Sequence, residues 1–379
     1  MGETREKDDG EGMSGTREEL TGVPGLERLV VVERTGSTND DLRSALTGVD
    51  GRLDLRAAAA WPHISALWAR RQDAGRGRAG RRWITPPGSA LTVSFVLRPL
   101  VPAAALAWLP LLAGLAARDV VDAILISARA PWRARTKWPN DVVLVPNERA
   151  GEGIAAGAST RAGTGGGAGT SAGPDPAEIP GWGRARKVAG VLAELIPTAG
   201  GIGARTSAGT TGTADASGAV AAGAADAPGA VGAAGAPGGG GAVGADRGAA
   251  CAVVLGIGVN TGQSESELPV PWATSLRLAG ARVEPRALLE PLSARLDELV
   301  TAWEAGEGDP DAGDGALGAA LRRACTTLGR RVRVDAPGGV LRGTAVDIAP
   351  GLVLRGADGT MRTVDAGDVS HVRTDGAVD

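Results

Sequence analysis

The feature that most limits what this chain can fold into is its glycine, which supplies 60 of the 379 residues. Together with alanine it fills most of the stretch from about residue 148 to 250. Such segments bury little apolar area for each residue that they order, so they cannot build a core. We therefore expect low-complexity inserts at 147–185 and 198–250, and a disordered acidic tail over residues 1–24. About 270 residues remain, enough for one large and one small domain.

Charge and cysteine content exclude several classes of protein. The 40 Lys and Arg against 43 Asp and Glu give a net charge of -3, which offers no general attraction to DNA or to an anionic membrane. The two cysteines and two histidines lack the spacing of a disulfide scaffold or a zinc site, so no protein-bound metal is predicted. The longest uncharged apolar run, residues 99–115, holds three prolines and is too short to span a bilayer. A cytoplasmic protein fits best.

Hydrophobic patterning over residues 25–328 alternates strands with helices. Ser37 and Thr38 provide a helix cap, and Asp40 and Asp41 complement the positive end of the helix dipole in the first turn. Pro110 is expected either to kink a helix or to open its main part, and Pro291 to break another. The predicted strands are 29–32, 64–69, 91–97, 142–145, 188–195 and 252–259, and the predicted helices are 39–46, 103–124, 285–303 and 316–328.

The pattern changes after Gly329 to short alternating strands at 331–334, 341–348, 352–355 and 361–364. Pro-Gly and Asp-Gly turns separate them. This spacing predicts a separate small β-barrel over residues 329–379.

A loop at 72–83 carries the strongest chemical signal, because it places four arginines within residues 76–82 between glycines. Arginine side chains and successive backbone N–H groups can together wrap a phosphate or carboxylate. Its glycines also satisfy GxGxxG, but a dinucleotide-binding turn must open a helix, whereas this one leads into Trp83, Ile84 and two prolines. The alternative is a disordered Arg-Gly segment that binds RNA.

Three further polar clusters lie at predicted strand ends or turns, where sites built from several strands are found. Each has an ordinary explanation: Ser37 and Thr38 as a cap alone, Pro139-Asn140-Asp141 as a turn, and Lys187 as a solvated charge. The clusters are residues 36–39, 136–141, and 186–190 with 256–260.

Together and in this order, the motifs GSTN, QxxGRGRxGRxW, KWPND, KxAGxLxE and GIGxN resemble those of the biotin-protein ligases, over residues 29 to about 372. The resemblance implies an α+β fold: a mixed β-sheet flanked by helices, related to the catalytic domain of class II aminoacyl-tRNA synthetases, over 25–328. An SH3-like β-barrel would follow it.

The activity implied by the resemblance has two steps. Biotin attacks the α-phosphate of ATP, with Mg²⁺ present, to give biotinyl-5'-AMP and pyrophosphate. A lysine of the biotin carboxyl carrier domain of acetyl-CoA carboxylase or a related carboxylase then displaces AMP. This chemistry requires fixed positive charge more than a proton relay, so a chain with only two histidines still has the residues that it needs.

The resemblance also implies a role for individual residues. Lys187 and Arg78 would be catalytic, and Trp83 would pack under the arginine loop. The residues that would bind biotin are Ser37, Thr38, Asn39, Gln72, Arg76, Gly77, Arg78, Lys187 and Gly190. Those that would face ATP or its metal are Lys137, Asn140, Asp141 and Asn260.

The chain departs from the family pattern at the two inserts, which we expect to loop out from strand ends. About 28 residues precede the first predicted strand, too few for a DNA-binding domain, so repressor activity is not expected. A lipoate-type ligase of the same fold is the nearest alternative, and an RNA-binding protein the most distant, since Trp83 alone offers a stacking surface near the loop. A homodimer is left open.

Overall fold

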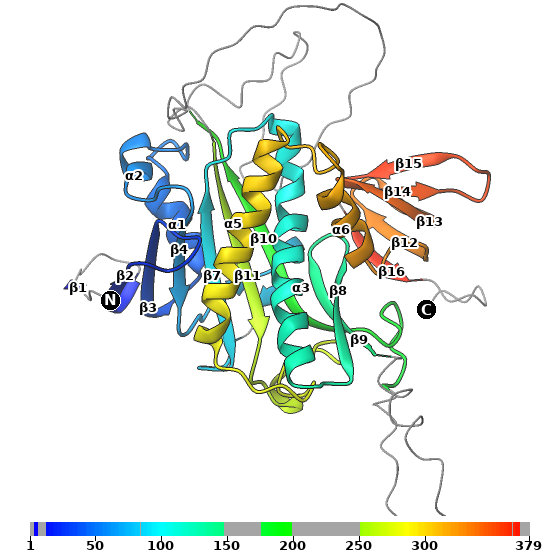
Figure 1. Cartoon of the computed structure of the whole chain (residues 1–379), viewed down its shortest axis with the longest axis horizontal. Helices are drawn as coiled ribbons and strands as arrows, with labels where there is room; N and C mark the ends of the chain where they lie inside the picture. Colours follow the sequence, from blue (N-terminus) through cyan, green and yellow to red (C-terminus); the bar gives the residue numbers. More distant parts are fainter. Residues whose placement is uncertain are drawn as a thin grey trace, which may run out of the picture.

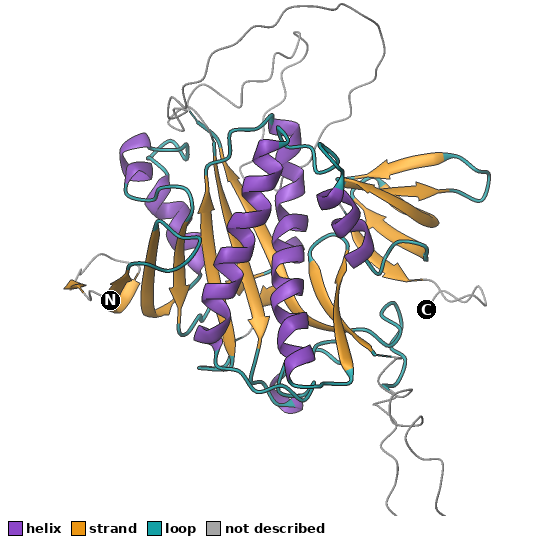
Figure 2. Cartoon of the chain, in the orientation of Figure 1, coloured by secondary structure: helices purple, strands orange, loops and turns teal. Residues whose placement is uncertain are grey.

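The computed structural model describes residues 4–6, 13–83, 85–147, 176–198, 251–365 and 367–371. A nine-stranded sheet forms the body of the molecule (Figure 1). Helices α1 (Thr38–Leu46) and α2 (Leu55–Ala59) lie on one face, and the long helices α3 (Leu109–Ser127) and α5 (Leu289–Ala305) lie on the other. A second, five-stranded sheet lies beside it, next to the short helix α6 (Figure 2). Of the two predicted inserts, the structure describes only residue 147, residues 176–185 and residue 198.

The large sheet is mixed, in the order β1-β2-β3-β4-β7-β11-β10-β9-β8. Strands β3 and β4 pair in parallel, and every other neighbouring pair is antiparallel. Its strands are β1 (Thr4–Glu6), β2 (Met13–Leu20), β3 (Arg28–Thr35), β4 (Ser65–Ala69), β7 (Ala90–Leu97), β8 (Trp132–Lys137), β9 (Asp141–Pro146), β10 (Arg186–Ile196) and β11 (Ala252–Asn260).

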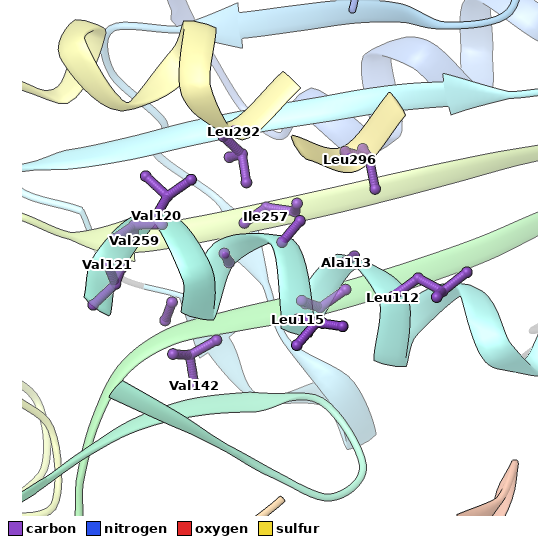
Figure 3. Packing of buried hydrophobic residues seen from close by; sticks show 14 of the residues in the cluster. Leu112, Ala113, Leu115, Val120, Val121, Val142, Ile257, Val259, Leu292 and Leu296 are labelled. Atoms are coloured by element: carbon purple, nitrogen blue, oxygen red, sulfur yellow. The ribbon is translucent and has the colours of Figure 1, made fainter. Parts of the chain in front are cut away.

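Alternation along the strands explains why both faces of this sheet are covered. In β3, Leu29 and Val31 belong to the core beneath α3 and α5, whereas Val30 and Val32 belong to the smaller core beneath α1 and α2. Successive side chains of a strand point to opposite faces, so an unbroken apolar run requires helices on both. Figure 3 shows side chains of α3 and α5 meeting those of the strands on one of these faces.

The predicted helices are confirmed with small shifts of their ends. Ser37 caps α1 (Thr38–Leu46), and Pro110 lies in the first turn of α3 (Leu109–Ser127), so it opens that helix instead of kinking it. The helix predicted over residues 285–303 does not break at Pro291. A 3₁₀ turn, Pro285–Leu288, leads into α5 (Leu289–Ala305), and Pro291 lies in the first turn of α5, where a proline is tolerated. The remaining helices are α2 (Leu55–Ala59), α6 (Ala316–Ala324) and the 3₁₀ segments Ala103–Trp108 and Glu265–Glu267.

Two parts of the sheet differ from the sequence prediction. Strand β8 was not anticipated, because its sequence WRARTK contains only two apolar residues, Trp132 and Ala134, among charged ones. The predicted disordered tail is wrong for Thr4–Glu6 and Met13–Leu20, which extend the sheet as β1 and β2. Strand β2 pairs along β3 from Met13↔Thr35 to Leu20↔Leu29, so backbone hydrogen bonding to an open sheet edge orders a segment whose composition is polar.

The C-terminal strands form an antiparallel sheet in the order β15-β14-β13-β12-β16. The expected barrel is not closed: β15 and β16 are edge strands that do not pair with each other within the described residues. Each is four residues long and pairs on one side only, which leaves too little backbone to close the ring. The strands are β12 (Arg331–Ala336), β13 (Gly339–Ala349), β14 (Gly351–Arg355), β15 (Met361–Val364) and β16 (Asp368–His371).

The two sheets share one hydrophobic core. Trp138 lies at the junction, since its backbone N–H donates to Thr327 Oγ1 (3.1 Å) and its indole N–H donates to the carbonyl of Pro350 (3.2 Å). The two predicted inserts, 147–185 and 198–250, lie largely outside the described residues. Strands β10 and β11, which flank the second insert, pair directly up to Ile196↔Ala252. No helix in the described ranges is both long and apolar enough to cross a bilayer.

Candidate functional site

A cavity of about 640 Å³ opens where β9, β10 and β11 meet the arginine loop and strand β16. All of the predicted site residues line it: Ser37, Thr38, Asn39, Gln72, Arg76, Gly77, Arg78, Lys137, Asn140, Asp141, Lys187, Gly190 and Asn260. They come from five separate stretches of the sequence. The fold therefore brings every predicted cluster to one place.

One end of the cavity is a buried, neutral hydrogen-bond network around the start of α1. Gln72 Oε1 accepts from the backbone N–H of Thr38 (2.9 Å) and from its hydroxyl (3.2 Å). Ser94 Oγ of β7 lies within hydrogen-bond distance of both Thr38 Oγ1 (2.7 Å) and Asn39 Oδ1 (2.6 Å), so its one hydroxyl hydrogen is shared between two acceptors. These contacts fix the orientation of each side chain, so the pocket presents a preset arrangement of polar groups.

Glu194 connects this network to the arginine loop. Its carboxylate accepts from Asn39 Nδ2 (2.7 Å) and from Arg76 Nη2 (3.2 Å), and Arg76 also pairs with Asp40. The Glu194 side chain is 17% exposed, so the charge that it gives to Arg76 is only partly screened by water. Arg76 is thus held by two carboxylates at the base of the loop.

The loop itself is a short hairpin of β5 (Gly75–Arg76) and β6 (Arg82–Trp83), closed by a 3₁₀ turn, Arg78–Gly80. Ala79 and Gly80 have positive φ (55° and 71°). The backbone N–H of Gly77 donates to the carbonyl of Arg81 (2.6 Å) and that of Arg81 to the carbonyl of Arg78 (3.2 Å). At its tip, Arg81 also pairs with Asp368 of β16 (2.8 Å). Carboxylates therefore neutralise two of the loop's four arginines, Arg76 and Arg81.

The guanidinium of Arg78, unlike those of Arg76 and Arg81, makes no hydrogen bond to another described residue, and it is less exposed than Arg82, which is likewise unpaired. Burial lowers the pKa of Arg78, and the carboxylates of Asp368 and Asp141 oppose that shift. A partly buried cation without a bound acid, facing a cavity, is suited to hold an anionic ligand.

Lys187 begins the opposite wall. Its ammonium lies 2.6 Å from Asp141 Oδ1 and 5.7 Å from the ring of Trp83. The backbone around it is fixed as well, because its N–H donates to the carbonyl of Trp272 (2.6 Å) and its carbonyl accepts from Thr274 (2.8 Å). A bulge between Lys187 and Ala189 interrupts the pairing of β10 with β9 at this point, which turns the side chain relative to a regular strand.

Lys137 is the most buried cation of the cavity, with 5% of its surface exposed. Burial lowers the pKa of its ammonium; Asp141 opposes this shift and Lys187 adds to it. The ammonium donates to the carbonyl of Val369 (2.6 Å) and lies 4.4 Å from the ring of Trp182. Val369 of β16 and Trp182 thus cover part of the Lys137 ammonium.

The glycines of β10 and β11 make room for the site. A Cβ atom on Gly258 would lie 2.6 Å from the Trp83 ring, and one on Gly190 would lie 3.1 Å from Lys187 Nζ. A Cβ on Gly256 would collide with the amide of Asn39. Because the strand backbone carries no side chain here, the loop tryptophan and the helix cap can lie against it. Trp83 thus packs against these strand glycines beneath the arginine loop, as the resemblance implied, and it also lines the cavity.

The amides of Asn140 and Asn260 line the cavity but are bonded to the protein. Asn140 Nδ2 donates to the carbonyl of Val191 (2.7 Å) and Asn260 Nδ2 to that of Thr274 (2.9 Å), while Asn260 Oδ1 accepts from Gln263 (2.9 Å). Both side chains hold the walls together, and that leaves each with less capacity for a nucleotide than the sequence suggested.

Sequence reasoning missed several residues of the cavity wall. Trp182, from the described end of the first insert, stacks on Trp272 with ring centroids 5.8 Å apart. Asp368, Val369 and Ser370 come from the C-terminal sheet. The chain has 9 Trp and only 1 Phe, and this unusual tryptophan content was a signal that could have drawn attention to both residues. Nothing in the local sequence marks β16 as part of a site.

The cavity offers few carboxylates that could bind a metal ion directly. Within the described ranges, no group of three His, Cys, Asp and Glu side chains could hold one. Asp141 is the nearest carboxylate to the cationic wall, and it is paired with Lys187. This arrangement suits Mg²⁺, which in phosphate-binding sites keeps several waters and takes few protein carboxylates beside the substrate oxygens.

Two family models match parts of this chain. Residues 52–204 match the model of the Biotin/lipoate A/B protein ligase family, and residues 327–372 match that of the Biotin protein ligase C terminal domain. A biotin--[acetyl-CoA-carboxylase] ligase of Mycobacterium tuberculosis is 28% identical over 94% of this chain and 94% of its own length. Another, from Paracoccus denitrificans, is 37% identical over 32% of this chain and 44% of its own length.

Among solved structures, a biotin protein ligase from Aquifex aeolicus in complex with biotin has a similar fold. It aligns with a TM-score of 0.50 and 18% identity, over 91% of this chain and 98% of that one. The expected mixed sheet with flanking helices is therefore confirmed, whereas an antiparallel sheet that does not close stands in place of the expected barrel.

Proposed function

The chain belongs to the biotin protein ligase family, and on that premise we propose that it is an ATP-dependent biotin--[acetyl-CoA-carboxylase] ligase. In the first step a carboxylate oxygen of biotin attacks the α-phosphorus of ATP, and pyrophosphate leaves. In the second, the neutral amine of a carrier-protein lysine attacks the acyl carbon of biotinyl-5'-AMP. AMP then leaves with the bonding electrons, and the amine gives up a proton.

The observation that carries the proposal is the gathering of Lys187, Lys137 and the unbonded guanidinium of Arg78 around one cavity. The first step brings an anion against a polyanion, so its barrier falls when fixed positive charge surrounds the reacting oxygens. Lys187, held between Asp141 and Trp83, would stabilise the charge that develops on the α-phosphate. Arg78 would hold the phosphate of the intermediate.

Biotin would occupy the neutral end of the cavity. Its ring amides require donors and acceptors of fixed orientation, which the buried network of Thr38, Asn39 and Gln72 offers. Ser37 and Gly190 would complete this subsite, with Gly77 in the loop above it. Mg²⁺ would be carried on the nucleotide phosphates and would neutralise the leaving pyrophosphate. We assign Asn140, Asp141 and Asn260 to the nucleotide side of the cavity.

The proposed protein partner is the biotin carboxyl carrier domain of acetyl-CoA carboxylase or of a related carboxylase. We place the reaction in the cytoplasm, which agrees with both cysteines, Cys251 and Cys325, being free thiols. A homodimer is a further possibility that size measurement in solution would test.

The test is to incubate the protein with ATP, Mg²⁺, biotin and a carboxyl carrier domain, and to weigh the carrier by mass spectrometry. One added biotin and equimolar pyrophosphate are expected. A matched reaction with lipoate in place of biotin should give none. Modification by lipoate alone would identify a lipoate ligase of the same fold, and a protein that releases no pyrophosphate with either acid would not be a ligase of this type.

A further inference from the structure

The C-terminal sheet has one face that the described chain covers only at its β16 edge, where Asp368 pairs with Arg81 and Ser370 lies beside Gly181. The alternation in β12 defines it: Val332 and Val334 are buried in the shared core, whereas Arg331, Arg333 and Asp335 point the other way. We call the side of the sheet that carries these three residues the outer face. Figure 1 shows this sheet as a separate layer beside the large domain.

The register of the strands places more arginines on the outer face. Arg331 lies opposite Thr344, which lies opposite Arg355, so these three form one row across β12, β13 and β14. Arg333 lies directly opposite Arg342 in the next row. Directly opposed side chains of an antiparallel pair share a face and lie about 5 Å apart at Cβ, and rows are about 7 Å apart along the strand. The four arginines are therefore contiguous.

Acids offset only part of this charge. Arg333 pairs with Asp335 (2.7 Å), and Asp368, also on the outer face, pairs with Arg81 of the arginine loop (2.8 Å). Among the described residues, Arg331, Arg342 and Arg355 have no carboxylate partner. Like charges placed opposite each other destabilise a sheet, as Arg333 and Arg342 do here. An acidic surface that binds to this face would relieve the repulsion between these arginines, and that relief would favour binding.

The outer face is continuous with the cavity. Asp335, Asp368 and Ser370 line the cavity, and they belong to the same two rows that continue into Arg333, Arg342 and Val340. An occupant of the outer face would thus border the mouth of the site. Val340, in the row of Asp335, and Met361, opposite Arg355, are 50% and 57% exposed and add apolar contact area to the outer face.

We propose that the outer face of the C-terminal sheet, centred on Arg331, Arg342 and Arg355, is the docking surface for an acidic face of the protein that receives biotin. This rests on the proposed function, because the second step requires a folded partner to place one lysine amine in the cavity. A surface beside the mouth with three unpaired cations steers such a partner and fixes its orientation. The described outer face carries no aromatic side chain, so it offers nucleic acid no stacking platform.

The experiment uses the full-length variant Arg342→Glu/Arg355→Glu and measures the two half-reactions separately. Release of pyrophosphate from ATP and biotin should equal that of wild type, because neither residue lines the cavity. Transfer of biotin to Nα-acetyl-lysine should also be unchanged. The kcat/KM for a carboxyl carrier domain should fall about tenfold or more, mainly through KM, and the wild-type value should decline with added salt more steeply than that of the variant.

Arg362→Glu is the matched control, because Arg362 is exposed on the same sheet but pairs with the buried Leu354, on the opposite face. It should leave the carrier reaction unchanged. The neutral variant Arg342→Gln/Arg355→Gln should have an intermediate effect, which separates a charge effect from altered folding. A carrier domain whose acidic surface residues are replaced with lysine should react with wild type at a lower kcat/KM. The same carrier should partly restore the kcat/KM of the charge-reversed variant.

The outcomes are distinguishable. Unchanged kcat/KM for the carrier, with normal pyrophosphate release in all variants, would overturn the docking proposal and leave the proposed function standing. Absence of pyrophosphate release from wild type would overturn the proposed function instead. Binding of RNA or DNA to wild type that is lost in the charge-reversed variant would show that the outer face serves a nucleic acid, contrary to the proposal.

Discussion

The ammonium of Lys187 owes its position to contacts on every side. Asp141 holds its charge, Trp83 covers it, and Gly190 leaves the space that it occupies. The backbone on either side is fixed by hydrogen bonds to the segment at Trp272 and Thr274. A long, flexible side chain is in this way oriented before substrates bind, which is what electrostatic stabilisation of a transition state requires.

We expect Lys187→Ala to lower the rate of adenylate formation about a hundredfold or more, because removing one oriented charge from a reacting centre costs that order of magnitude. The rate is measured as pyrophosphate release at saturating biotin and ATP. Lys187→Arg, which can keep the ion pair with Asp141, is the matched control and should retain more activity. An Ala variant that is folded by circular dichroism yet releases pyrophosphate at the wild-type rate would remove Lys187 from the catalytic groups.

At the scale of elements, the site depends on strands whose backbone is left bare. Strand β11 has glycine at 256 and 258, and its regular pairing with both β10 and β7 is uninterrupted there. These glycines are therefore not bulges or turns. They are places where a helix cap and a loop tryptophan approach the sheet from above.

Gly258→Ala should disturb the arginine loop more than the sheet. The new methyl group would meet the Trp83 ring at 2.6 Å, so Trp83 and the hairpin β5–β6 must move away. Overpacking of this kind costs about 1–3 kcal/mol. We expect weaker binding of biotin by calorimetry and a lower melting temperature, whereas Gly338→Ala, which has open space around its Cβ, should change neither. Biotin affinity equal to wild type would show that Trp83 does not support the pocket.

For the whole molecule, strand β16 makes the C-terminal sheet part of the site. Asp368 pairs with Arg81, and Val369 accepts from Lys137, so neighbouring residues of one strand contact the arginine loop and the deepest cation. Arg81 also donates to the carbonyl of Arg78 (3.3 Å), which links the contact to the residue proposed to hold the intermediate. The shared core and the hydrogen bond from Trp138 hold the two sheets in the relative position that these contacts require.

Asp368→Asn should therefore weaken retention of biotinyl-5'-AMP without unfolding the protein. Both side chains of the pair with Arg81 are about half exposed, so the effect should be modest, about two- to fivefold. The half-time of adenylate release after gel filtration measures it, and high salt should reduce the difference from wild type. Asp358→Asn, at an exposed turn of the same sheet, is the control. Equal half-times at low salt would show that the loop closes without the C-terminal sheet.

The sequence by itself determined most strands and helices of the catalytic domain, though not β1, β2 or β8, and the polar clusters that line the cavity, though not its walls at Trp182 and β16. It could do so because these features are local: apolar periodicity, a Ser37 cap, glycines in strands, and motifs recognisable as a set. Tertiary structure decided the rest. Polar β2 became a strand only because an open sheet edge supplied hydrogen-bond partners, and the arginine loop gained order from Asp40, Glu194 and Asp368, which lie up to 287 residues away. Long-range pairing of charges and backbone has no signature in a local pattern.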